Sequence, residues 1–266
     1  MQITDNTFVV TGGGNGIGRA VVLEILARGG RVAALDLSEP GLEETARLAA
    51  AGERLSLHAV NITDRAAVKA LPAVIADLHP HIDGLVNVAG IIQPFVKIEE
   101  LGFDVIERVM NVNFWGVVNT TKTFLPVIRR RPAGAIVNIS SMGALTPVPG
   151  QAAYGASKAA VKLFTEALFA ELQGTSVAAT VVFPGAIATD ITANSGVTMP
   201  NMGSTGRKAP EPTRPEEAAR QIVAAIEKGS YRVTIGKDVT MLDRLSRLSP
   251  RRATLILAGQ MKELLS

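Results

Sequence analysis

The stretch "TFVVTGGGNGIG", from Thr7 to Gly18, decides the fold of this chain. Its first five residues are apolar or β-branched, as in a buried strand, and a glycine-rich turn follows. A helical period then begins near residue 16. Glycines allow a tight bend and let a pyrophosphate approach the amides that open the helix. The stretch therefore predicts the first unit of a dinucleotide-binding sheet, although a flexible turn without a ligand remains the alternative and the glycines at 12, 16 and 18 depart from GxGxxG.

The alternation of strand and helix continues along the chain. Because the strand-like runs are almost continuously apolar, we expect a parallel sheet covered by helices on both faces. The predicted fold class is α/β, a doubly wound parallel sheet of about seven strands (Rossmann fold) with right-handed crossovers. The expected strands are 7–11, 31–36, 54–60, 83–90, 133–141, 176–185 and 231–236. The expected helices are 16–29, 40–51, 64–79, 99–129, 154–168, 215–228 and a tail near 238–264.

Two segments stand outside this alternation in an otherwise single predicted domain, 1–266. Residues 190–214 form a long irregular stretch, and loops of this length in compact domains are usually functional, so we expect it to cover a substrate. Residues 238–266 are predicted to form a helical extension that is amphipathic and basic. Such a segment suits an acidic membrane surface, but it suits equally a pocket cover or a subunit contact, which we favour.

Composition excludes several classes of function. The 266 residues contain no cysteine, which excludes disulfides and thiol catalysis, and the scattered His58, His79 and His81 indicate no metal site. A net charge of +3 does not indicate a nucleic-acid-binding protein. No run of eighteen apolar residues and no secretory signal is visible, so we expect a cytoplasmic protein without membrane contact.

Asp36 ends the second strand-like run, about 20 residues beyond the glycine turn. A carboxylate at this position can accept hydrogen bonds from the adenosine ribose hydroxyls, whereas a phosphate on that ribose would meet its negative charge. A turn or helix-capping aspartate is the alternative. No Arg or Lys lies in the turn before Gly16 or in "DLSE" after the strand. The predicted cofactor is therefore NAD rather than NADP.

Tyr154 and Lys158 stand four residues apart in "YGASKAAVKLFTEAL", so both side chains leave the same face of a helix. A free tyrosine has a pKa of about 10 and is a poor base at neutral pH. A nearby cation lowers the phenol pKa, which suits general acid–base catalysis. Taken alone, the pair is better explained as an ordinary helix surface, a packed tyrosine ring beside an exposed lysine.

Several motifs occur in order along the chain. They are "TGGGNGIG" (11–18), "NVAG" (87–90), "VNFWG" (112–116), "SS" (140–141), "YGASK" (154–158) and "PGAIAT" (184–189). Together they resemble the short-chain dehydrogenase/reductase family over roughly residues 3–236. The ordered set is specific, because each motif lies at a strand end or helix start where that family places it.

The resemblance implies four catalytic residues. Tyr154 would exchange a proton with the substrate, and Ser141 would hold the substrate oxygen, with Ser140 the less favoured candidate. Lys158 would lower the Tyr154 pKa and reach the nicotinamide ribose. Asn113 would keep a water that connects Lys158 to solvent.

The resemblance also implies where the cofactor binds. The glycine turn, Asp36 and the ends of four strands would contact it, with Ile187 and Thr189 on the nicotinamide carboxamide. Asn61 stands where the family usually has Asp but keeps an acceptor, and Val88 replaces a commoner Asn. The implied cofactor residues are Gly12, Asn15, Gly16, Ile17, Gly18, Asp36, Asn61, Ile62, Asn87, Ala89, Gly90, Tyr154, Lys158, Pro184, Ile187 and Thr189.

The substrate residues implied by the same layout are mostly apolar, and the loop's cations, Arg207 and Lys208, lie near its far end. We therefore expect an uncharged, apolar secondary alcohol or its ketone. The implied residues are Ser141, Tyr154, Gln93, Phe95, Met142, Val148 and Gln151, with 143–145, Ala186, Val197, Met199 and Met202 nearby.

Three functions are compatible with these motifs. The favoured one is an NAD-dependent oxidoreductase that interconverts an alcohol and a ketone. A non-catalytic dinucleotide-binding redox sensor is the first alternative, disfavoured because all four catalytic residues are present. A reductase held at a membrane surface by the basic tail is the second. In similar proteins the helix near 99–129 and the Tyr154 helix form paired interfaces, so a homodimer or homotetramer is expected.

Overall fold

A seven-stranded parallel sheet forms the centre of the protein. The computed structural model describes residues 1–197 and 211–260. The sheet order is β3-β2-β1-β4-β5-β6-β7, so chain order reverses between β1 and β4, which confirms the predicted doubly wound fold. The strands are β1 (Thr7–Thr11), β2 (Arg31–Asp36), β3 (Leu55–Ala59), β4 (Gly84–Asn87), β5 (Gly134–Ile139), β6 (Val177–Pro184) and β7 (Arg232–Ile235).

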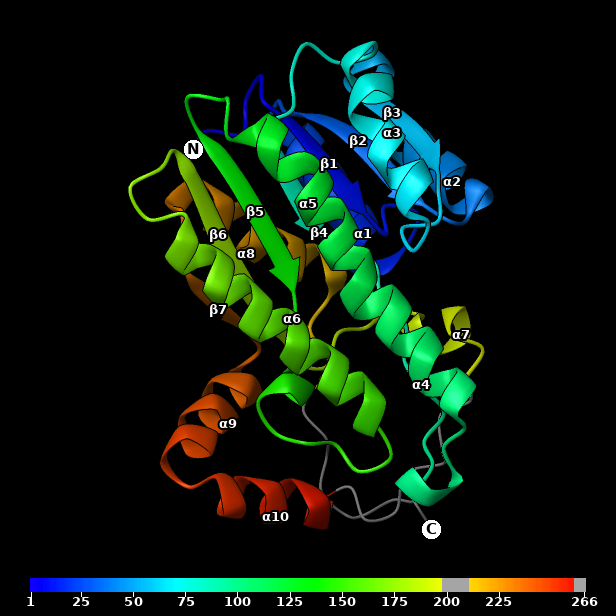
Figure 1. Ribbon diagram of the computed structural model, residues 1–266, viewed down its shortest axis with the longest axis vertical. Coiled ribbons are helices and arrows are strands. Elements are labelled where there is room, and N and C mark those ends of the chain that lie inside the picture. Colours follow the sequence, from blue (N-terminus) through cyan, green and yellow to red (C-terminus); the bar gives the residue numbers. More distant parts are fainter. Residues whose placement is uncertain (198–210, 261–266) are drawn as a thin grey trace.

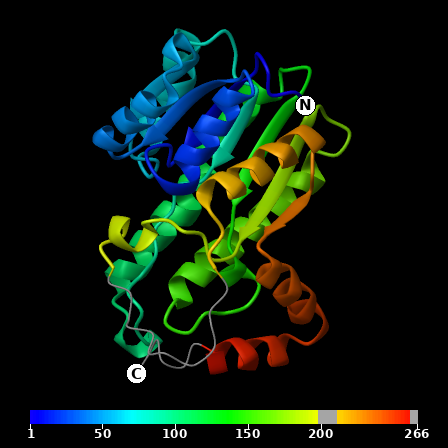
Figure 2. The same ribbon diagram turned by 180° about the vertical axis from the view of Figure 1, so that it is seen from behind.

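Helices cover both faces of the sheet (Figures 1 and 2). Neighbouring residues of β1 show why both faces must be covered: Val10 belongs to one apolar layer and Val9 to the other, because side chains alternate along a strand. One face carries α1 (Gly16–Ala27), α2 (Glu39–Ala49) and α8 (Pro215–Lys228). The other carries α3 (Arg65–Ala76), α5 (Gly116–Ile128) and α6 (Ala152–Glu171).

Burial of the strands follows their place in the sheet. Every residue of β1 and β5 is buried, as the nearly continuous apolar runs predict for central strands of a parallel sheet. The edge strands β3 and β7 are only partly buried. The apolar pattern therefore predicted the central strands well.

The helix expected over 99–129 is interrupted. A short 3-10 turn, η2 (Ile98–Glu100), precedes α4 (Phe103–Met110), and the π-helical turn η3 (Asn111–Trp115) separates α4 from α5. Single π-helical turns inside α-helices occur frequently at functional sites. Here the turn contains Asn113, whose side chain is held by the backbone of a different segment, as described below.

The carboxyl end of the sheet carries the remaining elements, and Figure 1 shows α7, α9 and α10 beyond it. They are α7 (Ile191–Asn194), α9 (Lys237–Leu248) and α10 (Pro250–Gln260), with 3-10 turns η1 (Gly52–Arg54) and η4 (Met142–Ala144) elsewhere. Proline is suited to the first turn of a helix, and α10 begins at Pro250, just after α9 ends at Leu248. Within the described ranges no helix is long and apolar enough to cross a bilayer.

Candidate active site

The glycine turn brings α1 against β1 more closely than any larger residue would allow. A Cβ added to Gly18 would lie 1.9 Å from the carbonyl oxygen of Gly12. Gly12 and Gly16 have φ angles of +71° and +51°, a region that favours glycine. The Asn15 side chain accepts the Gly16 amide at 2.6 Å and caps α1, and Ile17 packs against the core. The turn therefore leaves the helix N-terminus open to an anion, as a dinucleotide site requires.

Asp36 has a second task besides the one predicted. Its Oδ2 accepts the Gly14 amide at 2.9 Å and its Oδ1 accepts the Ser38 amide at 3.0 Å. Each carboxylate oxygen keeps capacity for another donor, such as a ribose hydroxyl. The nearby cation Arg19 donates to the carbonyl oxygens of Gly14 and Gly41, so the backbone already engages its guanidinium.

The segment after β4 is fastened to β1. Thr11 is buried, and its Oγ1 accepts the amides of Val88 at 3.0 Å and Ala89 at 3.2 Å. A Cβ on Gly12 would lie 2.9 Å from the Ala89 nitrogen. The glycine turn and Ala89–Gly90 are thus brought together, as the resemblance implies.

Asn87 has a structural role besides the cofactor contact that the resemblance implies. Its side chain is buried within the protein: Nδ2 donates to Asn138 Oδ1 at 2.8 Å, and Oδ1 accepts from Thr120 Oγ1 at 2.8 Å. Asn138 Nδ2 in turn donates to Thr165 Oγ1 at 2.9 Å. This amide network joins β4, β5, α5 and α6, so the Asn87 side chain stabilises the sheet, and its contact with a cofactor stays a prediction.

Two predicted residues at the adenine side differ in exposure. Asn61 is exposed, and its Oδ1 accepts the Thr63 amide at 3.0 Å, which leaves its Nδ2 for another acceptor. Ile62 is buried, and its carbonyl oxygen accepts from Asn119 Nδ2 at 3.0 Å. The turn after β3 is therefore held from α5.

The structure separates the two adjacent serines after β5. Ser140 is buried, and its Oγ donates to the Lys158 carbonyl oxygen at 2.8 Å, a contact that fastens α6 to the sheet. Ser141 is half-buried, and its Oγ accepts the Gly143 amide at 3.1 Å. Ser141 also lowers the pKa of the Tyr154 phenol, and both side chains lie beside Gly143, so Ser141 is the serine that belongs to the candidate site.

The side chain of Lys158 is almost completely buried. It is 4% exposed, and its Nζ donates to the Ile139 carbonyl oxygen at 3.0 Å. Burial lowers the pKa of Lys158 to about 8. Nζ lies 6.0 Å from the centre of the Tyr154 ring, and a Cβ on Gly90 would lie 3.1 Å from Nζ. Gly90 therefore leaves open the space in front of the ammonium group.

The pKa of Tyr154 is raised in the protein alone, whereas the sequence predicted that it would be lowered. Burial raises the pKa of Tyr154, and the hydrogen bond with Ser141 only partly opposes this. The prediction from spacing was therefore wrong for the protein without its cofactor. The physical reason is that withdrawing the phenol from water disfavours the phenolate more than its neighbours stabilise it.

Asn113 is fully engaged by protein groups. From the turn η3, its Oδ1 accepts the Ile91 amide at 2.8 Å, and its Nδ2 donates to the Ile91 carbonyl oxygen at 2.9 Å and to Ser157 Oγ at 3.0 Å. Ser157 Oγ donates to the Tyr154 carbonyl oxygen at 2.7 Å. The side chain thus connects η3, the segment after β4 and the first turn of α6.

Three predicted substrate residues have other roles. Gln93 is fully buried, and its carboxamide binds the start of α6. Gln151 is also buried and donates to the Gln93 carbonyl oxygen at 2.8 Å. Met142 packs against a small apolar cluster that contains Phe183 and Val239. The side chains of both glutamines are buried and bind protein groups, whereas Phe95 and Val148 are half-buried; contact of any of these residues with a substrate stays a prediction.

The segment after β6 returns over the glycine turn. Pro184 is the buried last residue of β6, and Ile187 pairs with Thr213. A Cβ on Gly16 would lie 3.2 Å from Thr189 Cγ2, so Thr189 lies beside the turn. Ser195 Oγ accepts the Ile92 amide at 3.0 Å. The ends of the predicted substrate loop are thus fixed, whereas Met199, Met202, Arg207 and Lys208 lie outside the described residues.

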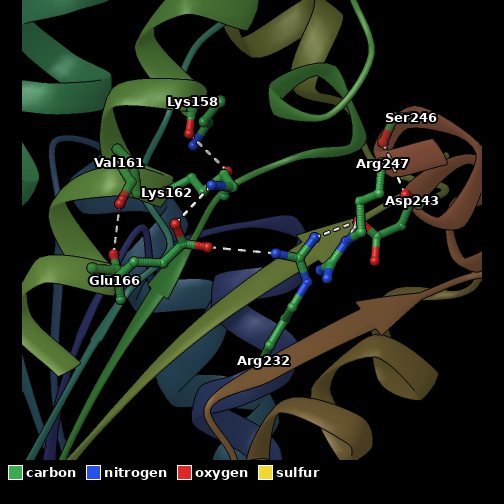
Figure 3. A network of polar contacts seen from close by, with 10 residues as sticks. Lys158, Val161, Lys162, Glu166, Arg232, Asp243, Ser246 and Arg247 are labelled. Atoms are coloured by element: carbon green, nitrogen blue, oxygen red, sulfur yellow. Dashed lines mark hydrogen bonds and ion pairs between the residues drawn. The ribbon is translucent and has the colours of Figure 1, made fainter. Parts of the chain in front are cut away.

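A hollow of about 400 Å³ lies beside η4, lined by residues of α6, β7 and α9. Arg232 lies between Glu166 of α6, at 3.4 Å, and Asp243 of α9, at 2.5 Å (Figure 3). Its guanidinium carbon is 4.2 Å from the centre of the Phe183 ring. None of the seven predicted substrate residues lines this hollow. Through Arg232 of β7, these ion pairs connect α9 to α6, the helix that carries Tyr154.

Among the described residues, no group of three or more His, Asp or Glu side chains is placed so that it could hold a metal ion. The polar groups that do converge are Ser141, Tyr154 and Lys158, at the carboxyl ends of the strands where doubly wound sheets bind ligands. The glycine turn and Asp36 fit a dinucleotide, because a Cβ at Gly12 or Gly18 would clash with the backbone and Asn15 engages only the Gly16 amide at the helix N-terminus.

Comparison with known proteins agrees with this geometry. The family model for short chain dehydrogenases matches residues 6–199. The chain is 37% identical over 247 residues to the putative oxidoreductase SadH of Mycobacterium tuberculosis, covering 90% of this chain and 89% of that protein.

Two solved structures share the fold. A short-chain dehydrogenase/reductase of Burkholderia phymatum in complex with NAD has a TM-score of 0.83 and 22% identity, with 96% of this chain and 97% of that chain covered. A short chain dehydrogenase of Burkholderia cenocepacia in complex with NADP has a TM-score of 0.80 and 26% identity, with 98% and 99% covered. The two neighbours differ in cofactor.

Proposed function

The chain belongs to the short-chain dehydrogenase family, and from that starting point we propose that it transfers hydride between NAD and a secondary alcohol or its ketone. The grouping of Ser141, Tyr154 and Lys158 carries the proposal. The phenol and the Ser141 hydroxyl lie close together, and the buried lysine ammonium lies 6.0 Å from the centre of the phenol ring. An acid–base group, an oxygen-binding group and a cation in one place are what alcohol oxidation requires.

The mechanism assigns each side chain a step. Ser141 and Tyr154 hydrogen-bond the substrate oxygen, and the Tyr154 phenolate takes the hydroxyl proton as hydride leaves the carbon; reduction is the reverse. Lys158 stabilises the phenolate and binds the nicotinamide ribose. NAD, when bound, supplies the hydride acceptor. Its positive ring, added to Lys158, would offset the burial that raises the Tyr154 pKa in the protein alone.

The choice of NAD rests on Asp36. A 2′-phosphate would have to approach its carboxylate, and Arg19, which could compensate, is held by the carbonyl oxygens of Gly14 and Gly41. Leu37, which follows Asp36, is exposed and offers no charge. These contacts favour NAD over NADP in the proposal.

The proposed substrate is uncharged and apolar, bound near Ser141 and Tyr154 under the 190–214 segment. Phe95 and Val148 are the remaining apolar candidates of the predicted set that are half-buried. A small carboxylated or phosphorylated substrate would want a cation close to the reacting carbon, and Lys158 already serves the phenol and the ribose. We propose a homodimer or homotetramer as the assembly, with no nucleic-acid or membrane partner.

The experiment is a screen of secondary alcohols with NAD and of ketones with NADH, followed by NADH absorbance. Tyr154→Phe serves as the inactive control. We expect activity to rise with apolar size, each buried CH₂ adding up to about 0.8 kcal/mol. A short hydroxy acid or a sugar phosphate as best substrate would overturn the proposed substrate class. Tight NADH binding without any turnover across the screen would favour the redox-sensor alternative.

A further inference from the structure

Three consecutive residues after β4 are each held by a different part of the protein. Ile91 is bound through both backbone atoms by Asn113 of η3. Ile92 donates its amide to Ser195, just after α7. Gln93 extends its carboxamide to the start of α6. Residues 91–93, here called the junction segment, therefore connect the cofactor side of the site to the helix that carries Tyr154.

The start of α6 lacks a cap of its own. The residue at the N-cap position is Gln151, whose side chain makes no capping hydrogen bond. The amides of the first turn of a helix have no partner within the helix, and burial of an unpaired amide costs about 1–3 kcal/mol. The two amides that an N-cap side chain ordinarily satisfies are those of the second and third helical residues, here Ala153 and Tyr154.

Gln93 satisfies these amides from about sixty residues away. Its Oε1 accepts from the Ala153 amide at 2.7 Å and from the Tyr154 amide at 3.1 Å. Its Nε2 donates to the Gly150 carbonyl oxygen at 2.9 Å. Gln151 completes a reciprocal pair by donating Nε2 to the Gln93 carbonyl oxygen at 2.8 Å. Every polar atom of the Gln93 side chain is therefore used at the start of α6.

We propose that Gln93 is a positioning residue for Tyr154: its carboxamide caps α6 from the junction segment and fixes the phenol against Ser141. The cap acts on the backbone of Tyr154 itself, because the Tyr154 amide is one of the two it binds. On the opposite side of the same turn, Ser157 Oγ donates to the Tyr154 carbonyl oxygen and accepts from Asn113. Both the backbone amide and the backbone carbonyl oxygen of Tyr154 are therefore held by side chains.

The proposal rests on the proposed function in one respect, that Tyr154 is the acid–base group. It adds a role for a residue outside that set. The junction segment directly follows Val88–Gly90, whose first two amides are bound by Thr11. Gln93 therefore links the position of Tyr154 to the position of this predicted cofactor-binding segment. A cap that only stabilised the fold would not need to lie on this segment.

The test uses the fact that the chain has two tyrosines, Tyr154 and Tyr231. In a Tyr231→Phe background, NMR of ¹³C-labelled tyrosine follows the ionisation of Tyr154 alone. Amide hydrogen exchange at residues 153 and 154 reports the cap directly. Both measurements need no substrate, so they decide this inference even if the proposed reaction fails.

Gln93→Leu removes the acceptor and the donor at similar size. We expect amide exchange at residues 153 and 154 to accelerate at least about tenfold, and the Tyr154 titration to move toward its ordinary value as the phenol gains water. With a substrate in hand, kcat should fall at least about tenfold while the Kd for NADH stays within about twofold. Gln93→Glu keeps the acceptor, so it should restore the protection, and its charge should raise the Tyr154 pKa.

Gln173→Leu is the matched control, the same substitution just beyond the other end of α6, where Nε2 donates only to the Phe169 carbonyl oxygen. It should leave the Tyr154 titration and kcat unchanged. The proposal is overturned if Gln93→Leu lowers thermal stability but leaves the Tyr154 titration where it was, which would make the cap merely structural. It is equally overturned if exchange at residues 153 and 154 does not respond.

Discussion

The Asp36 carboxylate accepts the Gly14 amide at 2.9 Å, a contact between residues 22 positions apart. A Cβ on Gly14 would lie 2.9 Å from the same Asp36 oxygen. The residue expected to select the cofactor therefore also holds the turn expected to receive its pyrophosphate. Substitutions at Asp36 should alter both cofactor choice and the order of the glycine turn.

For the cofactor, the unmodified protein should prefer NAD over NADP by at least about tenfold in kcat/KM, since one charged hydrogen bond contributes about 1.5–3 kcal/mol. Asp36→Ala combined with Leu37→Arg should shift the preference toward NADP. Asp36→Asn is the control, because its one oxygen can still accept the Gly14 amide while the charge is removed, although the Ser38 amide then loses its acceptor. Equal kcat/KM for the two cofactors in the unmodified protein would contradict the assignment.

For the acid–base group, Tyr154→Phe should reduce turnover by about 10²–10⁴-fold, the usual contribution of such a group. The Kd for NADH should change little, because the ring and its packing remain. Tyr231→Phe, which alters the other tyrosine, should retain full activity. Undiminished turnover in Tyr154→Phe would refute the mechanism.

For the buried cation, Lys158→Met should abolish most activity, weaken cofactor binding and stabilise the fold. The pKa of Lys158 falls from 10.5 to about 8, a difference equivalent to about 3 kcal/mol. The Ile139 carbonyl oxygen loses its donor in this variant, which lowers the free energy of unfolding by about 1 kcal/mol. We expect a net gain of about 1–2 kcal/mol in the free energy of unfolding at pH 7, measured with urea.

The same lysine gives a pH signature. Between pH about 8 and 10.5 the unfolded chain binds more protons at Lys158 than the folded protein, so Lys158 makes stability rise with pH in that window. Lys158→Met should remove this rise. An unchanged pH dependence between the two proteins would show that the ammonium is not buried as described.

A histidine pair should make the protein sensitive to acid. Ser56 Oγ lies 2.8 Å from Nε2 of both His58 and His79. Burial lowers the pKa of each histidine below 6.5, and Arg31 adds to this at His79. The unfolded chain therefore binds more protons as pH falls below about 6.5, and stability is lost there. Urea unfolding at pH 7.5 and 5 should show a smaller loss for His58→Gln/His79→Leu; an equal loss would exclude the pair as the cause.

Assembly should depend on exposed apolar residues near the expected helix interfaces. Phe103 of α4 is 84% exposed and Leu163 of α6 is 67% exposed, and large apolar exposure of this kind often marks a contact between proteins. Leu163→Glu should dissociate the proposed dimer or tetramer at micromolar concentration, as measured by light scattering. Leu248→Glu, on α9, is the control. A purely monomeric unmodified protein would contradict the proposed assembly.

The fold, and the placing of Tyr154 and Lys158 on one helix face, were predictable because their causes are local. Apolar runs, the glycine turn and the helical period around Tyr154 and Lys158 depend on neighbours within a few positions. The ordered motifs then identified the family, which the comparisons bear out. The spacing of four residues placed Tyr154 and Lys158 on one face, and the structure agrees.

Tertiary structure decided what the sequence by itself left open. The sequence determined the order of strands and helices, the glycine turn and the candidate catalytic set. Only the folded chain shows that Gln93 caps α6, that Asn87 belongs to a buried amide network and that η3 interrupts the long helix at Asn113. It also reverses the expected Tyr154 pKa shift. The physical reason is the same throughout: burial, and hydrogen bonds between segments far apart in the sequence, depend on how strands and helices pack, and no local pattern records that packing.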